Sequence, residues 1–281
     1  MINTFKSQLN EINSGASRPK NVDQTSVKKL GVLGSGLMGH GITYVSALSE
    51  IEVVMTDSSQ ENADKGLSRI KDILHDSVEL GRTTQENADK ILNRIITTDD
   101  YNKLQDCDLI IEAVFEDRDL KGQVTTQAER IMDENGIFAS NTSTLPISSL
   151  AKRSIRPEKF IGIHFFSPVH KMKLVEIIKG ENTNDETIAK AFDYVLKIRK
   201  IPIVVNDSRG FYTSRVFSTY TNEGLALLAE GNHPQEIESA GKKAGMPVGP
   251  LAVIDEINLG LVVRIRNQTR KDLAAEGKEL P

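Results

Sequence analysis

Apolar and polar residues follow one another along the chain in blocks that suit buried strands and amphipathic helices. Residues 28–33 form a short apolar run that leads directly into glycines and then into a helix-compatible segment at 37–48. A second apolar run occupies 51–56, and the polar stretch 60–93 carries apolar residues at helical spacing. The pattern predicts a strand, a tight turn, a helix, a second strand and two helices that break near Gly81.

Five further apolar runs are continuous rather than alternating, which suits strands that are buried on both faces. Helical patterns at 120–132 and 187–198 lie between several of these runs. This order predicts an α/β fold in which a mostly parallel sheet has helices on both faces. The expected strands cover residues 108–115, 136–140, 160–166, 173–178 and 201–205.

The two ends of the chain depart from this pattern. The N-terminal residues are rich in Ser, Asn, Gln and Lys around one short apolar set, which allows a short helix. Strand signals stop after Asp207, where helices are expected at 211–230 and 234–244. The tail from residue 261 turns abruptly hydrophilic, so we expect the last domain to be truncated. The expected division is 1–27 (linker or disordered tail), 28–207 (sheet domain) and 208–281 (start of an all-α domain).

Composition excludes several classes of protein. The chain has 281 residues, 38% of them hydrophobic, and can bury a substantial core. Its net charge of -4 leaves no basic surplus for nucleic acid. No apolar run reaches the roughly 18 residues of a spanning helix, and no signal peptide is evident. A single cysteine, Cys107, excludes an internal disulfide and a cysteine-built zinc site. We expect a cytoplasmic protein with no membrane span, no nucleic-acid partner and no metal.

The motif GSGLMG follows the first strand and opens the first helix. Gly34 permits a tight turn, Gly36 lets the backbone approach a pyrophosphate, and Gly39 allows close packing of the helix. Asp57 ends the second strand 18 residues after Gly39, near the spacing of an acid that binds ribose hydroxyls. A carboxylate repels a 2′-phosphate and the following serines carry no positive charge, so NAD is favoured over NADP. The alternatives are an ordinary glycine-rich turn and a turn or N-cap aspartate.

One histidine and one glutamate suggest acid–base chemistry. His164 closes a predicted strand at the edge where open α/β sheets bind ligands, and a neutral imidazole can take a hydroxyl proton near pH 7. Glu176 lies among apolar residues of the next strand, where a carboxylate needs a partner. A buried glutamate beside histidine can set its tautomer and stabilise imidazolium. A satisfied core histidine and a sheet-edge acid are the alternatives. His170 is a rival base, although its loop favours a solvated residue.

Two segments, residues 139–146 and 163–180, are especially dense in motifs. The runs SNTS-L-P, G-HFF-P and MKLVEII, with the later GF…R and MPVGP…DE, resemble the 3-hydroxyacyl-CoA dehydrogenases of fatty-acid β-oxidation. The resemblance covers roughly residues 28–260. With YVSAL, IIEAVFED and LPISSLA the chain is most similar to the dehydrogenase part of the bacterial multifunctional fatty-acid oxidation α-subunit. It implies a Rossmann-type NAD-binding domain followed by a helical domain.

The resemblance also implies a reaction, the NAD-dependent oxidation of (S)-3-hydroxyacyl-CoA to 3-oxoacyl-CoA. In this scheme His164 is the base, Glu176 orients it, and Ser143 hydrogen-bonds the substrate's 3-oxygen. A helix cap or turn serine is the alternative for Ser143, and an exposed helix start is the alternative for Glu116 and Lys121. The implied cofactor-binding residues are Gly34, Gly36, Leu37, Met38, Gly39, Asp57, Val114, Phe115, Glu116, Lys121, Ser143 and Ser167.

Two positions depart from the family pattern. Ser214 stands in GFYTSR where the family usually has an asparagine that helps to hold the substrate carbonyl, and Ser167 stands where many relatives have asparagine. A hydroxyl still donates one hydrogen bond, but it is shorter than the amide and lacks its two donors. We expect Ser214 to bind the substrate oxygen, with lower turnover if it falls short.

The resemblance extends to partners. The CoA end of the substrate is expected over residues 60–93, where Lys65, Arg69 and Lys71 would meet its phosphates, although a solvated helix face is the alternative. Relatives continue with helices that complete the C-terminal domain and the dimer interface. We therefore expect a portion of a larger protein that carries an enoyl-CoA hydratase domain and assembles with a thiolase subunit, or a homodimer.

Two other classes stay open. The β-hydroxyacid dehydrogenases act on free acids and also use a GxGxMG turn, but they rely on a catalytic lysine on a helix. A noncatalytic NAD-binding or structural relative is the second alternative, because a fold can keep its cofactor site after it loses activity.

Overall fold

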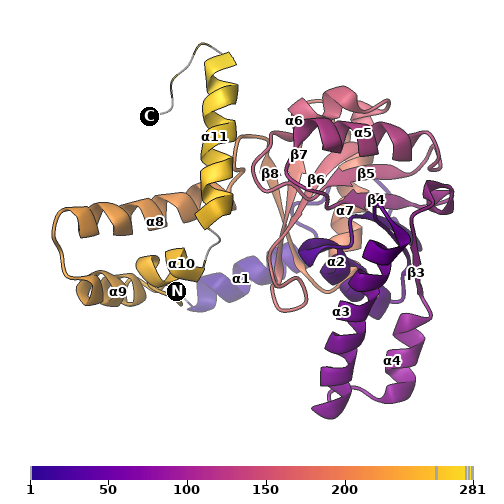
Figure 1. Cartoon of the computed structure of the whole chain (residues 1–281), viewed down its shortest axis with the longest axis horizontal. Coiled ribbons are helices and arrows are strands. Elements are labelled where there is room, and N and C mark those ends of the chain that lie inside the picture. Colours follow the sequence, from indigo (N-terminus) through magenta and orange to yellow (C-terminus); the bar gives the residue numbers. More distant parts are fainter. Residues whose placement is uncertain (1, 257–258, 276, 278, 280–281) are drawn as a thin grey trace. The chain divides into compact units, whose positions relative to one another are not determined.

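The computed structural model describes residues 2–256, 259–275, 277 and 279. The chain divides into two compact units, Met1–Phe211 and Tyr212–Pro281 (Figure 1). The first unit is built on one sheet, and the described part of the second unit is helical. Among the described residues, no helix combines the length and the apolar character that crossing a membrane requires.

The sheet of the first unit has eight strands in the order β3-β2-β1-β4-β5-β6-β7-β8. Strands β1 to β6 run parallel, β7 pairs antiparallel with β6, and β8 is parallel to β7. The mostly parallel, Rossmann-type sheet is therefore confirmed. The strands are β1 (Lys29–Leu33), β2 (Glu52–Thr56), β3 (Ile95–Thr98), β4 (Leu109–Glu112), β5 (Ile137–Ser140), β6 (Phe160–Phe165), β7 (Leu174–Lys179) and β8 (Ile201–Asn206).

Helices cover both faces of this sheet, as expected. One buried cluster packs strand residues against α2, α3, α4 and α7, and we call that side the α2–α7 face. A second cluster packs strand residues against α5 and α6, on the α5–α6 face. The helices are α1 (Ile2–Asn13), α2 (Leu37–Leu48), α3 (Gln60–Glu79), α4 (Gln85–Leu92), α5 (Arg118–Glu129), α6 (Ile147–Leu150) and α7 (Asp185–Lys197).

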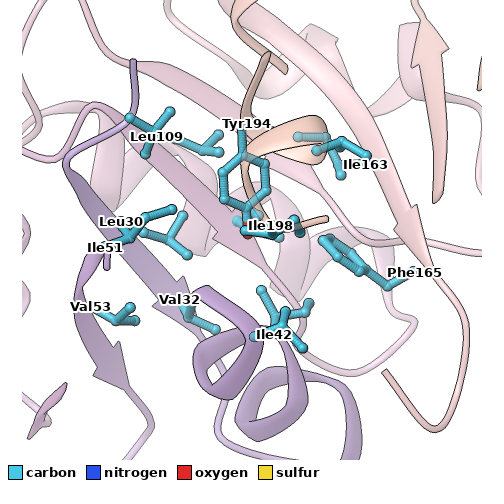
Figure 2. Packing of buried hydrophobic residues seen from close by; sticks show 14 of the residues in the cluster. Leu30, Val32, Ile42, Ile51, Val53, Leu109, Ile163, Phe165, Tyr194 and Ile198 are labelled. Atoms are coloured by element: carbon cyan, nitrogen blue, oxygen red, sulfur yellow. The ribbon is translucent and has the colours of Figure 1, made fainter. Parts of the chain in front are cut away.

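In the inner strands of the sheet, successive apolar residues belong alternately to the two clusters. Figure 2 shows side chains of the cluster on the α2–α7 face, among them Val32 of β1, Ile42 of α2 and Tyr194 of α7. The neighbour of Val32 in β1, Leu33, belongs to the cluster on the α5–α6 face. Side chains of a strand point alternately to its two faces, so a strand that is buried on both faces must be apolar throughout. This is why the predicted strands were continuous runs.

Residues 1–27, expected as a linker or disordered tail, contain helix α1 and a loop that is tied to α7. Arg18 donates from Nε and Nη2 to the two carboxylate oxygens of Asp193, at 2.7 and 2.8 Å. Asp193 also accepts from the backbone N–H of Thr25 at 2.8 Å. Burial opposes ionisation of Asp193, but these hydrogen bonds outweigh it and lower the pKa of the carboxyl. One guanidinium thus fastens the loop to the sheet domain.

Strand β3 and helix α6 of the sheet domain were not predicted. Strand β3 reads IITT and lies at the edge of the sheet, where Ile96 is exposed. Helix α6 has four residues. Neither contains enough apolar positions to show a period, so only the pairing with β2 and the packing on the sheet define them.

The second unit confirms the two helices that were expected after residue 207. Glu238 of α9 accepts from the backbone N–H groups of Leu251 and Ala252 at 2.8 and 3.1 Å, which ties α9 to the first turn of α10. Much of the hydrophilic tail lies in α11. The helices are α8 (Thr213–Ala229), α9 (Pro234–Lys243), α10 (Pro250–Glu256) and α11 (Leu259–Ala275).

Replacing the anchoring arginine tests the tie between the N-terminal loop and the sheet domain. Arg18→Ala is expected to lower the free energy of unfolding by about 1–3 kcal/mol, because charge-assisted hydrogen bonds to Asp193 are lost. Urea unfolding measures this change. The control Lys28→Ala, at an exposed position, should stay within about 0.5 kcal/mol of the unmodified chain. Equal stability of the two variants would show that the loop is not anchored.

Candidate active site

Four polar side chains lie near the carboxyl edge of the parallel strands, on the α5–α6 face. Glu112 ends β4 beside Ser140 at the end of β5, and His164 of β6 pairs with Glu176 of β7. Because β7 is antiparallel to β6, the first residues of β7 lie at the carboxyl end of β6. All four are at most 7% exposed. Open α/β sheets bind their ligands at this edge, so the sheet gathers its buried polar groups where a ligand would lie.

The histidine and the glutamate form a buried hydrogen-bonded pair. His164 Nδ1 lies 2.7 Å from Glu176 Oε2, and Glu176 is fully buried. An ionised carboxylate only accepts, so Nδ1 carries the proton and Nε2 is left as an acceptor. The ring of Phe166 packs against the imidazole at 4.5 Å between centroids, and that of Phe211 at 6.1 Å. This arrangement can hold one tautomer and stabilise the imidazolium that forms when Nε2 takes a proton.

A second buried group joins Glu112, Lys121 and Glu116, and we call it the charge cluster. Lys121 Nζ lies 3.0 Å from both oxygens of Glu112 and 3.3 Å from Glu116 Oε2. Burial raises the pKa of Glu112 despite its contacts with Lys121 and Ser140. Burial alone would lower the pKa of Lys121, but the two carboxylates outweigh it and raise that pKa. Lys121 is 2% exposed, so the alternative of an exposed helix start is wrong for this residue.

The loop after β5 carries Ser143 and is hydrogen-bonded to Glu116 of the charge cluster. Glu116 Oε1 accepts from Thr142 Oγ1 at 2.6 Å, from the backbone N–H of Ser143 at 3.2 Å and from Thr144 Oγ1 at 3.3 Å. Burial opposes ionisation of Glu116, but Lys121 and these donors outweigh it and lower the pKa of that carboxyl. Asn141 Oδ1 accepts from the backbone N–H of Phe165 at 2.8 Å, next to His164. The Ser143 loop therefore links the segment after β4 to the end of β6.

The glycine-rich turn has room for a cofactor at one position only. A Cβ on Gly34 (φ +94°) would lie 2.8 Å from the carbonyl oxygen of Ala113, and one on Gly39 would lie 1.7 Å from that of Gly34. A Cβ on Gly36 would meet nothing within 4 Å. Gly36 is also the N-cap of α2 and offers that helix no side-chain cap. Open space in front of an uncapped helix N-terminus suits a pyrophosphate.

Asp57 follows β2 and accepts hydrogen bonds from Ser35 in the glycine-rich turn. Its Oδ2 accepts from the backbone N–H and the hydroxyl of Ser35, both at 2.7 Å, and its Oδ1 accepts from the backbone N–H of Ser58 at 2.7 Å. Burial raises the pKa of Asp57, but these bonds outweigh it and the net pKa is lowered. The Ser35 hydroxyl has a second acceptor in the carbonyl of Asn62 at 2.7 Å. A ribose hydroxyl can therefore take the place of the Ser35 hydroxyl on the Asp57 carboxylate, because the Ser35 hydroxyl can still donate to the carbonyl of Asn62.

The remaining predicted cofactor residues lie around this turn. Strands β1 and β4 are neighbours in the sheet. From β1 the chain continues outward to β2 and β3, and from β4 it continues to the other side, to β5 and β6. Dinucleotides usually bind at such a topological switch point. Val114, Phe115 and Glu116 follow β4 at this point. Phe115 and Leu37 are strongly exposed, at 86% and 68%, and Met38 packs partly against the core. Ser167 is exposed just after β6.

Other predicted residues lie farther from this core. His170 is exposed, and its ring meets Tyr44 edge-on at 6.2 Å between centroids. Lys65 and Lys71 are exposed on α3, whereas Arg69 donates to the carbonyl of Ser35 in the turn at 3.3 Å. Ser214 lies in α8 of the second unit.

The sequence reasoning missed Glu112 and Asn141. Glu112 stands between Ile111 and Ala113 in an otherwise apolar run, which is the signal that drew attention to Glu176. Asn141 lies in a loop crowded with Ser and Thr, where no spacing distinguishes it.

A buried lysine holds the hairpin that joins His164 to Glu176. Lys200 Nζ donates to the carbonyls of Val169 and Met172, at 2.6 and 2.5 Å, and both residues lie in the turn between β6 and β7. Burial lowers the pKa of Lys200 to about 8. The two hydrogen bonds of the Lys200 ammonium fix this turn, although burial of that ammonium removes it from water and makes its charged form less favourable.

Two family models match the chain. The model described as "3-hydroxyacyl-CoA dehydrogenase, NAD binding domain" matches residues 29–208, and the model described as its C-terminal domain matches 210–280. Curated relatives named fatty acid oxidation complex subunit alpha are 41% identical over 248 residues in Shewanella frigidimarina and 40% over 253 residues in Shewanella baltica. The matches cover 88% and 90% of this chain, but the chain spans only 35% and 36% of those relatives.

Solved structures give the same grouping. An (S)-3-hydroxybutyryl-CoA dehydrogenase from Ralstonia eutropha superposes with a TM-score of 0.84 at 35% identity, covering 89% of both chains. A 3-hydroxybutyryl-CoA dehydrogenase from Escherichia coli superposes with a TM-score of 0.82 at 31% identity, covering 86% of this chain and 52% of that one.

Two glycine substitutions separate cofactor binding from folding. Gly36→Ala is expected to change the free energy of unfolding by less than about 1 kcal/mol, because its Cβ meets nothing, and to weaken NADH binding about tenfold or more. Gly39→Ala should instead destabilise the fold by about 3 kcal/mol, because its Cβ meets a backbone oxygen. Fluorescence titration and urea unfolding measure the two effects. Unchanged NADH affinity in Gly36→Ala would remove the cofactor from this turn.

The lysine of the β6–β7 turn makes stability depend on pH. Between pH about 8 and the ordinary lysine value of 10.5, the unfolded chain binds more protons at Lys200 than the folded chain. The stability of the unmodified chain relative to Lys200→Met should therefore rise with pH across this window. Urea unfolding at several pH values measures the difference. A flat difference between the unmodified chain and Lys200→Met across this window would contradict the lowered pKa of Lys200.

Proposed function

The chain belongs to the NAD-dependent 3-hydroxyacyl-CoA dehydrogenase family, and on that premise we propose that it oxidises (S)-3-hydroxyacyl-CoA to 3-oxoacyl-CoA in fatty-acid β-oxidation. The observation that carries this proposal is the buried contact of 2.7 Å between His164 Nδ1 and Glu176 Oε2 at the carboxyl edge of the sheet. It provides a base whose free nitrogen can accept the hydroxyl proton while hydride leaves the same carbon.

In the proposed reaction His164 is the general base. Its Nε2 takes the proton of the substrate's 3-hydroxyl, and Glu176 stabilises the imidazolium that results. Ser143 hydrogen-bonds the substrate's 3-oxygen, and Ser214 of the second unit binds a substrate oxygen. The phenyl rings of Phe166 and Phe211 restrict water around the imidazole.

The glycine-rich turn, Asp57 and the segment after β4 are proposed to hold the cofactor. NAD, when bound, supplies the acceptor for the hydride. Gly36 and the N-terminus of α2 would face the pyrophosphate, Asp57 the ribose hydroxyls, and Phe115 and Leu37 offer exposed apolar surface. Met38, Val114, Glu116, Ser143 and Ser167 remain proposed contacts. The role of Lys121 is treated separately below.

The chain's wider context is also a proposal. The curated relatives are named subunits of a fatty acid oxidation complex and are much longer than this chain. We propose that this sequence is the dehydrogenase portion of a multifunctional cytoplasmic protein. That protein would also carry an enoyl-CoA hydratase domain and assemble with a thiolase subunit. The alternative assembly is a homodimeric dehydrogenase. Residues 28–207 would be its NAD-binding domain, 208–281 its C-terminal dehydrogenase domain, and 1–27 the linker.

Loss of NADH absorbance with acetoacetyl-CoA tests the reaction in the reverse direction. His164→Gln and Glu176→Gln are each expected to lower kcat by about 10²–10⁴-fold, because in this direction the first removes the imidazolium that gives its proton to the 3-oxygen and the second no longer stabilises that imidazolium. NADH affinity should stay within about twofold, since neither residue lines the turn.

The matched control is His170→Gln, which removes the rival histidine and should retain most of the activity. A collapse in His170→Gln with activity kept in His164→Gln would move the base to the loop. NADH binding without any thioester-dependent oxidation would instead favour a noncatalytic relative.

A further inference from the structure

Acceptors of the protein itself surround the ammonium of Lys121. An ammonium has three N–H bonds, and Nζ already has four acceptors in reach: both oxygens of Glu112 at 3.0 Å, Glu116 Oε2 at 3.3 Å and the carbonyl of Val114 at 3.4 Å. The side chain is 3% exposed. Most of the donor capacity of Lys121 is therefore used inside the charge cluster.

The charge cluster connects two sides of the site. On one side, Glu112 Oε2 accepts from the backbone N–H of Val114 at 3.3 Å, and Lys121 donates to the carbonyl of the same residue, in the segment after β4. On the other side, Glu112 Oε1 accepts from Ser140 Oγ, and Glu116 Oε1 holds the Ser143 loop through its two threonine hydroxyls and a backbone N–H. One lysine thus links both loops.

We propose that Glu112 and Lys121 are positioning residues that hold Glu116, and through it the Ser143 loop, in the geometry in which Ser143 meets the substrate oxygen. The inference rests on the proposed function, in which Ser143 touches the substrate. It assigns a role to Glu112, and it gives Lys121 a role through Glu116 in addition to the implied cofactor contact.

The electrostatics explain why the lysine is needed. Glu112 and Glu116 both lie within 3.3 Å of one ammonium, so without it two carboxylates would face each other in a largely dry site. The side chain of Glu112 is 1% exposed, whereas that of Glu116 is 24% exposed. Glu116 is the carboxylate that can turn outward, and it would take with it the acceptor of Ser143 N–H and Thr142 Oγ1.

Hydrogen exchange at the Ser143 amide tests the positioning without any need for activity. In Lys121→Met this amide should exchange about tenfold faster or more, because its acceptor on Glu116 is no longer held. The amide of Gly34, which donates to the carbonyl of Thr56 at 2.8 Å, serves as the internal reference and should not change. The control Lys197→Met, at a lysine bonded to a carbonyl far along the chain, should leave both amides protected.

A double variant separates positioning from general stability. Glu112→Gln combined with Lys121→Met removes the uncompensated buried carboxylate, so the Tm should recover towards that of the unmodified chain. Glu116 still lacks its cation, so the Ser143 amide should remain fast. Protection that returns together with the Tm, or that Lys121→Met never loses, would overturn the proposal and leave the charge cluster a purely structural role.

A kinetic cycle gives the second readout. At saturating NADH, Lys121→Met should lower kcat at least about tenfold with Ser143 present, but by less than about twofold in a Ser143→Ala background, because the residue it positions is already gone. Equal losses in both backgrounds would also overturn the proposal. If the unmodified chain oxidises no NADH with acetoacetyl-CoA, the proposed function fails, and the exchange experiment alone decides whether the charge cluster holds the loop.

Discussion

The reversal of chain direction between β6 and β7 is the constraint on which the active edge of the sheet depends. Antiparallel pairing brings the start of β7 to the carboxyl end of β6 and sets Glu176 opposite His164. A register shift of one residue would turn Glu176 to the other face of the sheet. The turn that joins these strands is held by Lys200, a buried cation bonded to two carbonyls. A buried cation outside the site, Lys200, therefore helps to fix the position of Glu176 relative to His164 inside it.

The buried carboxylates Glu112 and Glu176 on the α5–α6 face are each paired with a basic side chain. Each carboxylate there has a partner close to the proposed chemistry: Glu176 has the imidazole of His164, and Glu112 has the ammonium of Lys121. Apolar residues of similar volume often stabilise a core as well as a buried ion pair does, so such pairs are weak evidence for stability. Their value here lies in direction, because each bond fixes where a neighbouring group points. Through Glu116 these bonds join the segment after β4, proposed to bind the cofactor, to the Ser143 loop, proposed to bind the substrate.

The glycine-rich turn shows how far local sequence can be taken. Three glycines were expected to serve a tight turn, cofactor access and helix packing, and the backbone gives each that surrounding: a positive φ at Gly34, open space at Gly36 and a carbonyl 1.7 Å from a Cβ at Gly39. Such motifs are readable because turn, strand end and helix start are contiguous in the chain. Strand β3 was missed for the opposite reason, since four residues of mixed polarity show no period and only pairing with β2 makes them a strand.

The amino-acid sequence by itself determined most of the strands and helices of the sheet domain, the glycine turn, and the residue types that carry the proposed chemistry. Continuous apolar runs are a direct consequence of burial on both faces, and they can be seen without knowing what packs on them. The tertiary structure alone decided which charges meet. Lys121 sits in an acidic, hydrophilic stretch that suggested an exposed helix start, yet it is buried because β4 delivers Glu112 beneath α5. Contacts of this kind depend on strand register and on how a helix packs, which no local pattern encodes.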